Sequence, residues 1–374
     1  MRQNASIASL TGIRGVAAIG VMLYHIQSFG PEFSLSFLQG IPLLKIGWTG
    51  VDLFFLLSGF ILFYVHDEAF RSLSWGKLRD FAILRVFRVY PLATAALLIV
   101  LAMVIADPGF ARWYPAIHNR ADLTPGAFFR TLFLATRWFP PFGGDWNQPV
   151  WSLSAEIVGY CAFPFATLLI TRYLKLGPAL ALALVAIALP PGLAIAEGRV
   201  VNNDIMGWAL VRMGGYFLGG MALCRVYRLM PAINARWASW LGSAAIVAIL
   251  AISYFPGAIG FMAFAFGALV FSLAFNVGIV NRLFSGGVAM FLGRISFPLY
   301  LIHVMPLMWL RYFISSEHVG WPYGALLVAI YLVVTVGGAY ALHLSIERPF
   351  QRWSHELLRR PRPIGQEAPS SGAA

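Results

Sequence analysis

The 374 residues are 59% hydrophobic and only 11% charged, and the mean hydropathy is +0.75. Soluble domains carry about 25% charged residues, so this composition excludes a soluble enzyme and indicates a polytopic membrane protein. The net charge of +12 does not indicate nucleic-acid binding, because the basic residues concentrate on one side of the predicted membrane spans. We therefore expect no nucleic-acid partner.

Apolar stretches of about 17 to 25 residues are long enough to cross the hydrocarbon core as helices. The sequence contains ten of them, at residues 9–28, 47–66, 90–106, 150–171, 177–196, 207–224, 237–255, 257–277, 287–309 and 322–345. The predicted fold is therefore an all-α, polytopic membrane helix bundle of about ten transmembrane helices.

The ends of the chain are assigned from charge and composition. The positive-inside rule places both termini in the cytoplasm. No small-residue cleavage site follows the first apolar stretch, so it is expected to remain in the mature protein. Residues 1–350 are predicted to form one transmembrane domain. Residues 351–374, which include a Pro-, Gly- and Ser-rich run, are predicted to form a largely disordered cytoplasmic tail.

The segment 107–149 on the predicted outer side is too long for a simple connection. Its aromatic part, 127–139, is interpreted either as a re-entrant or interfacial segment that caps an outward cavity, or as a plain amphipathic surface helix. Both cysteines, Cys161 and Cys224, fall in apolar stretches, so we expect buried small hydrophobic side chains rather than a disulfide or a metal site.

Two ionisable residues, Arg14 and His25, lie inside the first apolar stretch. Such groups are costly at membrane depth and by default mark function. Their separation of eleven residues places them on one face of a helix, about 16 Å apart along its axis. The pair therefore predicts a line of polar groups that crosses half a bilayer.

The second helix is predicted to run back beside the first and to begin with Asp52 near the level of His25. A carboxylate there would fix the imidazole tautomer and raise its basicity, as a general base requires. The alternative is that Asp52 only interacts with the dipole of its own helix N-terminus.

Glu156 and His303 are predicted to reach the same outer level from other helices. Each alone is compatible with a snorkelling or interface residue, but together with His25 and Asp52 they make four ionisable groups at one depth. A metal site is not expected, because no local ligand spacing of the H-E-x-x-H kind is present.

On the predicted inner side, Arg85 and Arg88 are expected on one face of a short amphipathic helix that precedes Pro91. Two guanidinium groups so spaced suit a phosphate. The alternative is an anchor for anionic lipid.

Six segments occur together in this order: LTGIRGVAAIGVMLYH, GVDLFFLLSGFIL, RVFRVYP, PVWSLSAEIVGY, ISFPLYLIH and IERPF. In this combination the chain resembles the acyltransferase-3 family of bacterial integral membrane enzymes over about residues 9–350. The resemblance implies transfer of an acyl group, commonly acetyl, from acyl-coenzyme A to hydroxyls of O-antigen, exopolysaccharide or Nod factor. It implies Arg14 and His25 as an essential pair, and Arg85 and Arg88 near the coenzyme. Some members carry a fused extracytoplasmic domain, so a separate extracytoplasmic partner protein is an expectation here.

The resulting hypothesis is a multi-pass O-acetyltransferase of the bacterial inner (plasma) membrane. In it Arg14, Arg85 and Arg88 bind the donor, and His25 is the general base with help from Asp52. Glu156, assigned to the catalytic group, is expected on the acceptor side with two substrate-binding residues, Trp151 and His303.

Alternatives remain at three levels. An acyl-His25 or acyl-Ser58 intermediate would replace direct transfer; Ser58 is assigned to the substrate-binding group. A small-molecule glycoside would replace a glycan or lipid-linked glycan as the acceptor. A transporter or flippase would use the same buried groups without chemistry, and a non-catalytic scaffold would leave them without a purpose.

Overall fold

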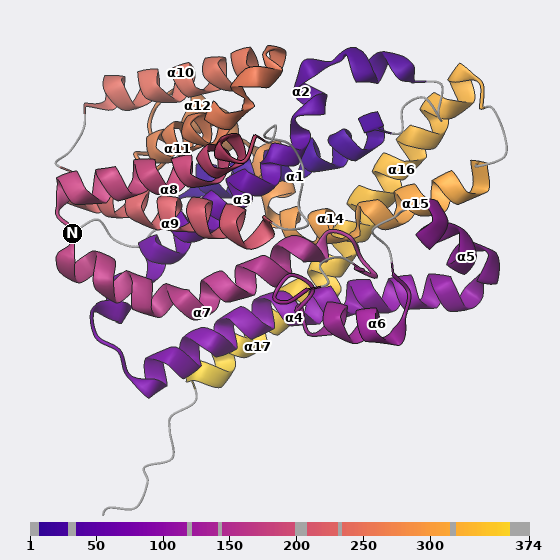
Figure 1. The fold of residues 1–374 in the computed structure, drawn as a ribbon, viewed down its shortest axis with the longest axis horizontal. Coiled ribbons are helices and arrows are strands. Elements are labelled where there is room, and N and C mark those ends of the chain that lie inside the picture. The colour runs from indigo at the N-terminus through magenta and orange to yellow at the C-terminus, as the bar shows by residue number, and fades with distance from the viewer. Residues whose placement is uncertain are drawn as a thin grey trace, which may run out of the picture.

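The structure is a computed structural model that describes residues 7–28, 35–117, 122–140, 144–198, 208–230, 234–314 and 319–359. All regular elements in these ranges are helical, and the long helices lie roughly side by side along the long axis of the molecule (Figure 1). The all-α prediction is confirmed.

Nine helical spans of the described residues are long and apolar enough to cross a membrane. They are built from α1 (Ala8–Ser28), α3 (Gly50–His66), α4 (Trp75–Ala106), α7 (Val150–Tyr173), α8 (Leu176–Ala196), α10 (Ala235–Tyr254), α11 (Met262–Leu273) with the preceding turn Pro256–Phe261, the pair α14 (Ser296–Ile302) and α15 (Val304–Ile314), and the pair α16 (Trp321–Leu342) and α17 (Arg348–Arg359). The tenth predicted stretch, 207–224, is present as α9 (Ala209–Leu229). Its arginines lower its hydropathy below that of the nine.

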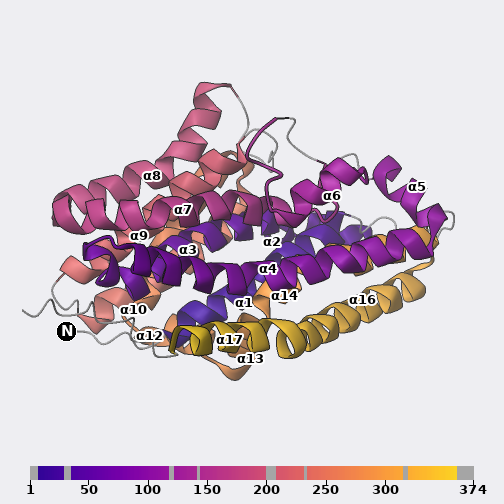
Figure 2. The ribbon, with the colours of Figure 1, turned by 90° about the horizontal axis from the view of Figure 1, so that it is seen from below.

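Short helices complete the chain: α2 (Pro42–Lys45), α5 (Pro108–Ile117), α6 (Pro125–Leu132), α12 (Gly278–Phe284) and α13 (Gly287–Arg294). In Figure 2, α5 lies at one end of the bundle.

Helix α4 corrects one prediction. The sequence predicted a short helix before Pro91 and a separate membrane helix from residue 90, but α4 runs without interruption through Pro91 for 32 residues. At 1.5 Å per residue it is about 48 Å long. A proline inside a helix removes one backbone hydrogen bond and introduces a clash, yet here the flanking turns continue. Arg85 and Arg88 therefore lie within a long helix rather than on a surface helix.

The predicted helix 287–309 is divided into α13, α14 and α15. The last division falls at His303, the C-cap of α14. Pro306 follows three residues later and has no N–H to continue the ladder. The carbonyl of His303 instead accepts a hydrogen bond from the Tyr331 hydroxyl on α16, at 3.0 Å. The break thus fixes the place of His303 in the bundle.

Helices α3 and α9 pack against each other along most of their length. A side chain at Gly59 of α3 would collide with the backbone carbonyl of Phe217, and one at Gly220 of α9 with that of Leu56. Small residues permit such close backbone contact between membrane helices. This contact sets α9 directly beside α3.

The segment 107–149 folds into α5, α6 and irregular turns. Helix α6 covers only the first part of the predicted segment 127–139. The remainder is irregular, and Arg137 there forms an ion pair with Asp145 in which both side chains are fully buried. Burial raises the pKa of the Asp145 carboxyl, and the Arg137 guanidinium opposes that rise. The segment is therefore not the plain surface helix of the second interpretation.

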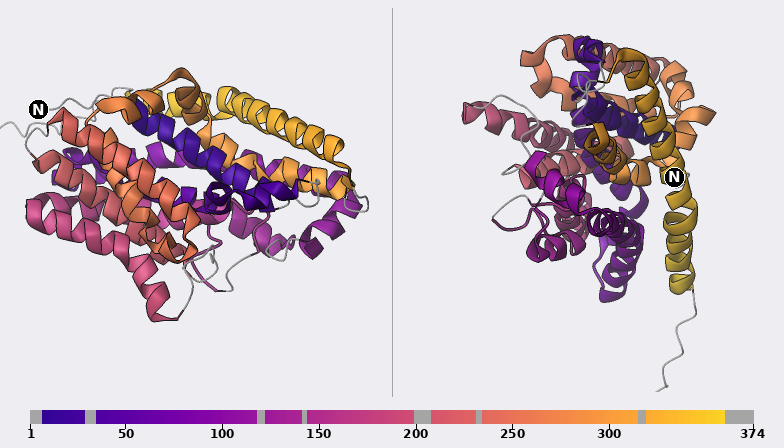
Figure 3. Two further views of the ribbon diagram at one scale, coloured as in Figure 1. Left: turned by 90° about the horizontal axis from the view of Figure 1, so that it is seen from above. Right: turned by 90° about the vertical axis from the view of Figure 1, so that its right-hand side faces the viewer.

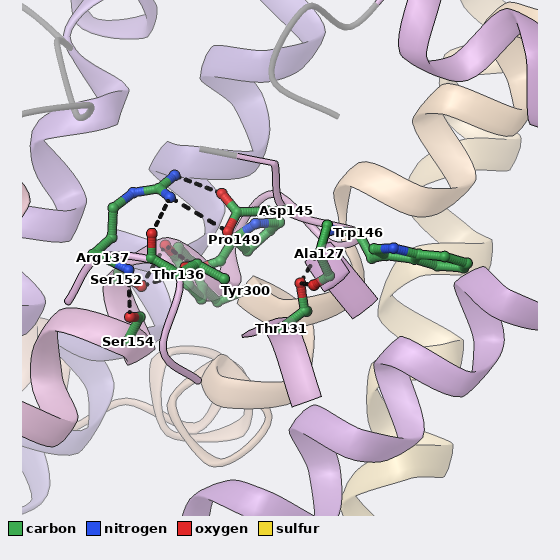
Figure 4. A network of polar contacts seen from close by, with 10 residues as sticks. All are labelled: Ala127, Thr131, Thr136, Arg137, Asp145, Trp146, Pro149, Ser152, Ser154 and Tyr300. Carbon is green, nitrogen blue, oxygen red and sulfur yellow. Dashed lines mark hydrogen bonds and ion pairs between the residues drawn. The ribbon is translucent and has the colours of Figure 1, made fainter. Parts of the chain in front are cut away.

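This irregular segment is tied to the bundle by the network in Figure 4. The backbone N–H of Arg137 donates to the Ser154 hydroxyl on α7 at 2.9 Å. Asn147 donates to the carbonyl of Leu301 on α14 at 3.0 Å. The segment thereby fixes the start of α7 against α14.

Helices α16 and α17 form one long rod, which runs beside α4 and stands at one side of the bundle (Figures 2 and 3). A π-helical turn, His343–Glu347, joins them. Helix α17 continues to Arg359, so the first nine residues of the predicted disordered tail are helical here. Residues 360–374 lie outside the described residues.

The cysteines differ in environment. Both are free, but Cys224 is buried and Cys161 is exposed on the surface of α7. The prediction of two buried cysteines is therefore wrong for Cys161, whose face of α7 is not covered by another helix.

Candidate active site

A cavity of about 360 Å³ lies between α1, α3, α4, α7, α14 and α17. We call it the arginine cavity, because Arg14, Arg85 and Arg88 all line it. The sequence assigned these three residues to one binding site, and the fold brings them together from α1 and α4. Three cations in a partly apolar cavity form a strong site for phosphate or another anion.

Arg85 illustrates how this cavity is built. Its guanidinium carbon lies 5.5 Å from the ring centroid of Phe81 and 5.9 Å from that of Tyr160. Its buried Nε has no hydrogen-bond partner among the described residues. Aromatic faces hold the cation in place but leave hydrogen-bonding capacity for a ligand.

Arg88 is held by a carboxylate that the sequence analysis did not assign. Its Nη1 lies 3.5 Å from Oε1 of Glu347, which is buried in the π-helical turn. Glu347 also contacts His343 at 2.7 Å and accepts from Gln351 at 3.1 Å. Its presence in the IERPF segment, directly after an apolar helix, is the signal that could have identified it.

Glu156 and Ser58 meet in the arginine cavity. The Ser58 hydroxyl donates to Oε1 of Glu156 at 2.5 Å. The expectation that Glu156 stands at the level of His25 is therefore corrected: Glu156 lies two helical turns into α7 and turns toward α3 and α4. Ser58, assigned to the substrate-binding group, also lies with the arginines.

A second, much smaller cavity, of about 30 Å³, contains His25 and His303. We call it the histidine cavity. Its wall also includes Trp48, Trp151 and residues Gln148 and Pro149, which precede α7. The predicted neighbours His25, His303 and Trp151 are thus brought together from α1, the α14–α15 break and α7.

The hydrogen bonds of the two histidines define their tautomers. Nδ1 of His303 lies 2.6 Å from the Tyr300 carbonyl, and Nδ1 of His25 lies 2.9 Å from the Val21 carbonyl. Carbonyl oxygens only accept, so both Nδ1 atoms carry hydrogen. Nε2 of His303 lies 3.3 Å from Nδ1 of His25, so the single hydrogen on that Nδ1 is shared between the Val21 carbonyl and this nitrogen. The lone pair of the His25 ring consequently lies on Nε2.

Asp52 does not form the expected pair with His25. Its Oδ1 accepts from Nε and Nη2 of Arg212 on α9, at 3.1 and 2.7 Å, and both side chains are buried. The partner was overlooked although Arg212 is a charged residue inside an apolar stretch, the same signal that singled out Arg14. Asp52 lies in the first turn of α3, so the dipole interaction considered as the alternative is also available to it.

The two cavities adjoin at Val51 and Tyr300, which line both. The Tyr300 hydroxyl lies 2.8 Å from that of Ser152 and donates to the Pro149 carbonyl at 3.2 Å (Figure 4). Tyr300 therefore stands as the partition between the arginines and the histidines. Within the described ranges, no group of three or more His, Cys, Asp or Glu side chains could hold a metal ion.

Comparisons with known proteins identify the family of the chain. The sequence profile of an acyltransferase domain, that of the acyltransferase-3 family, matches residues 7–344. The chain is 28% identical to "Acyltransferase MdmB" of Streptomyces mycarofaciens over 96% of this chain and 94% of that protein.

Two further relatives carry names of O-acetyltransferases. "Peptidoglycan O-acetyltransferase OatA" of Listeria monocytogenes is 23% identical over 79% of this chain and 49% of its own length. "Putative O-acetyltransferase SACOL0978" of Staphylococcus aureus is 26% identical over 44% of this chain and 26% of its own. The chain thus spans nearly all of the first relative but only part of these two. No solved structure matches the chain.

Proposed function

The chain belongs to the acyltransferase-3 family, and on that premise we propose that it moves an acetyl group from acetyl-coenzyme A to a hydroxyl of a surface or exported glycan. It is a multi-pass membrane O-acyltransferase. The observation that carries the finer proposal is the pair of adjoining cavities, one lined by three arginines and the other by two histidines. We place the protein in the bacterial inner membrane.

In this proposal the donor enters from the cytoplasm, and its phosphates bind Arg14, Arg85 and Arg88. Guanidinium groups pair with phosphate oxygens through two parallel hydrogen bonds. The pantetheine arm then runs past Tyr300 and carries the thioester to the histidine cavity. Arg14 and His25 are about 16 Å apart along α1, a length that matches such an extended arm.

The proposed chemistry is direct transfer. Nε2 of His25 removes the proton of the acceptor hydroxyl, and the oxygen forms a bond to the thioester carbonyl carbon. The carbon–sulfur bond then breaks, and the leaving thiolate of coenzyme A takes the proton from the imidazolium. His303, placed by the fold on Nδ1 of His25, takes the orienting role that the sequence analysis gave to Asp52.

The name of OatA supports a peptidoglycan hydroxyl as the first candidate acceptor, and a small-molecule glycoside is the second. Because this chain covers only half of OatA, a separate extracytoplasmic partner protein remains part of the proposal.

The test uses the purified full chain in lipid nanodiscs with acetyl-coenzyme A labelled in the acetyl group and a soluble peptidoglycan fragment. We expect free coenzyme A to appear with acetyl incorporation into the fragment. Movement of labelled fragment across sealed vesicles without thioester consumption would instead support the transporter alternative and overturn the proposal.

A further inference from the structure

A buried ion pair stands directly behind the wall of the histidine cavity. The guanidinium carbon of Arg212 lies 5.2 Å from the ring centroid of Trp48 and 5.6 Å from that of Trp151. Both indoles line the histidine cavity, whereas neither Arg212 nor Asp52 does. The two indoles therefore stand between the ion pair and that cavity.

Stability alone gives little reason for this arrangement. A buried ion pair can often be replaced by apolar side chains of similar size without loss, because desolvation offsets the attraction. Arg212 is 6% exposed, and its Nη1 has no hydrogen-bond partner among the described residues. A planar cation close to two aromatic rings does have a distinct effect, since it restricts the positions of both rings.

The helices that carry the ion pair hold Arg212 in a fixed position beside the two indoles. Asp52 is on α3 and Arg212 is on α9. These two helices pack closely against each other at Gly59 and Gly220. Trp48 precedes α3 and Trp151 begins α7. The Arg212 side chain thus connects α9 with the start of α3 and the start of α7, beside the cavity that contains His25.

We propose that Arg212, held by Asp52, is a positioning residue that fixes Trp48 and Trp151 as the acceptor-binding walls of the histidine cavity. This inference rests on the proposed function and specifies its acceptor class. A volume of about 30 Å³ has room for only a few water-sized groups. The cavity therefore admits the reacting hydroxyl on a slim arm, while the C–H-bearing face of the sugar ring packs against an indole.

The kinetic test compares Arg212→Lys with the wild-type chain, again with acetyl-coenzyme A and the soluble peptidoglycan fragment. Lysine keeps the charge opposite Asp52 but loses the planar group beside the indoles. We expect the KM for the fragment to rise about 2- to 30-fold, the range of cation–π contacts. The KM for acetyl-coenzyme A and the slow hydrolysis of the thioester without acceptor should stay unchanged.

The matched control is Arg225→Lys, the same change on the same helix. Arg225 donates to the carbonyls of Leu174 and Thr171 and lines neither cavity. An equal rise in both KM values for Arg212→Lys, or the same effect from Arg225→Lys, would show a general structural role and overturn the inference.

A spectroscopic arm is independent of catalysis. Tryptophan emission is compared between wild type and Arg212→Lys, and between the same two chains in a background with Trp48→Phe and Trp151→Phe. We expect a spectral difference in the first pair that disappears in the second. A difference that persists without these indoles, or no difference at all, overturns the positioning role. Failure of the wild-type chain to release coenzyme A contradicts the proposed function alone.

Discussion

The arginine cavity and the histidine cavity adjoin each other but differ in volume and in the charge of their lining residues. The first has about 360 Å³, three guanidinium groups and walls from six helices. The second has about 30 Å³ and two histidines whose hydrogen bonds fit neutral rings. A roomy charged site suits binding of a large anion, whereas a narrow site with an oriented lone pair suits one proton transfer. The large charged cavity and the small histidine cavity are thus separated by two side chains, Val51 and Tyr300.

The largest expected effect comes from the small cavity. His25→Ala should lower kcat by about 10²- to 10⁴-fold, the range for loss of a general base, while the KM for acetyl-coenzyme A changes little. Steady-state release of coenzyme A measures both constants. The control is His66→Ala, because His66 is packed among Phe70, Phe81 and Phe163 and lines neither cavity. Retained turnover in His25→Ala would contradict the assignment of proton transfer to the histidine cavity.

The next largest effect comes from the large cavity. Arg85→Ala combined with Arg88→Ala should raise the KM for acetyl-coenzyme A about 10- to 150-fold, since a charged hydrogen bond contributes roughly 1.5 to 3 kcal/mol. The increase should diminish at high salt. Arg79→Ala on the exposed face of α4 serves as the control. Equal effects from Arg79→Ala and the double variant would favour the lipid-anchor interpretation.

A smaller effect is expected at the partner of His25. His303→Phe should reduce kcat about 2- to 13-fold, because it removes one neutral hydrogen bond to Nδ1 of His25. His303→Gln, whose side-chain oxygen can accept from the same N–H, should recover most of that loss. If both variants behave alike, the orienting role of His303 is wrong.

The smallest effect is expected for Ser58→Ala. Direct transfer predicts a change in kcat of only about twofold, the lower end for a neutral hydrogen bond, and no acetyl adduct on the intact protein after mixing with acetyl-coenzyme A. Removal of an essential nucleophile would cost many orders of magnitude. A large loss, together with an adduct on the wild-type chain, would establish the acyl-Ser58 route instead.

The sequence predicted the helices and the grouping of the three arginines well, because apolar length and charged residues inside apolar stretches are local signals. Apolar length defined the membrane helices, and helix phase placed Arg14 and His25 on one face of α1. The predicted pair of Asp52 with His25 was wrong for a physical reason. The sequence indicated how far along α3 Asp52 lies, but it did not indicate which side of α3 faces which neighbouring helix. The face of α3 that carries Asp52 points to α9, whose closeness depends on glycines far apart in the sequence.

The same limit explains Glu156 and His303. Both were placed at one depth, yet Glu156 turns toward the arginines and His303 toward His25. The break that positions His303 arises from Pro306 and from Tyr331 on another helix. Contacts of this kind depend on tertiary packing, which no single stretch of sequence contains.

The π-helical turn His343–Glu347 has a consequence for the direction in which α17 faces. Such a turn holds one residue more than an α-helical turn, so the same residues wound as a regular α-helix would rotate everything after them by about 100°. Gln351, Ser354 and His355, which line the arginine cavity from α17, would then face elsewhere although no residue beyond the turn had changed. The wide turn between α16 and α17 is therefore itself a determinant of the arginine cavity.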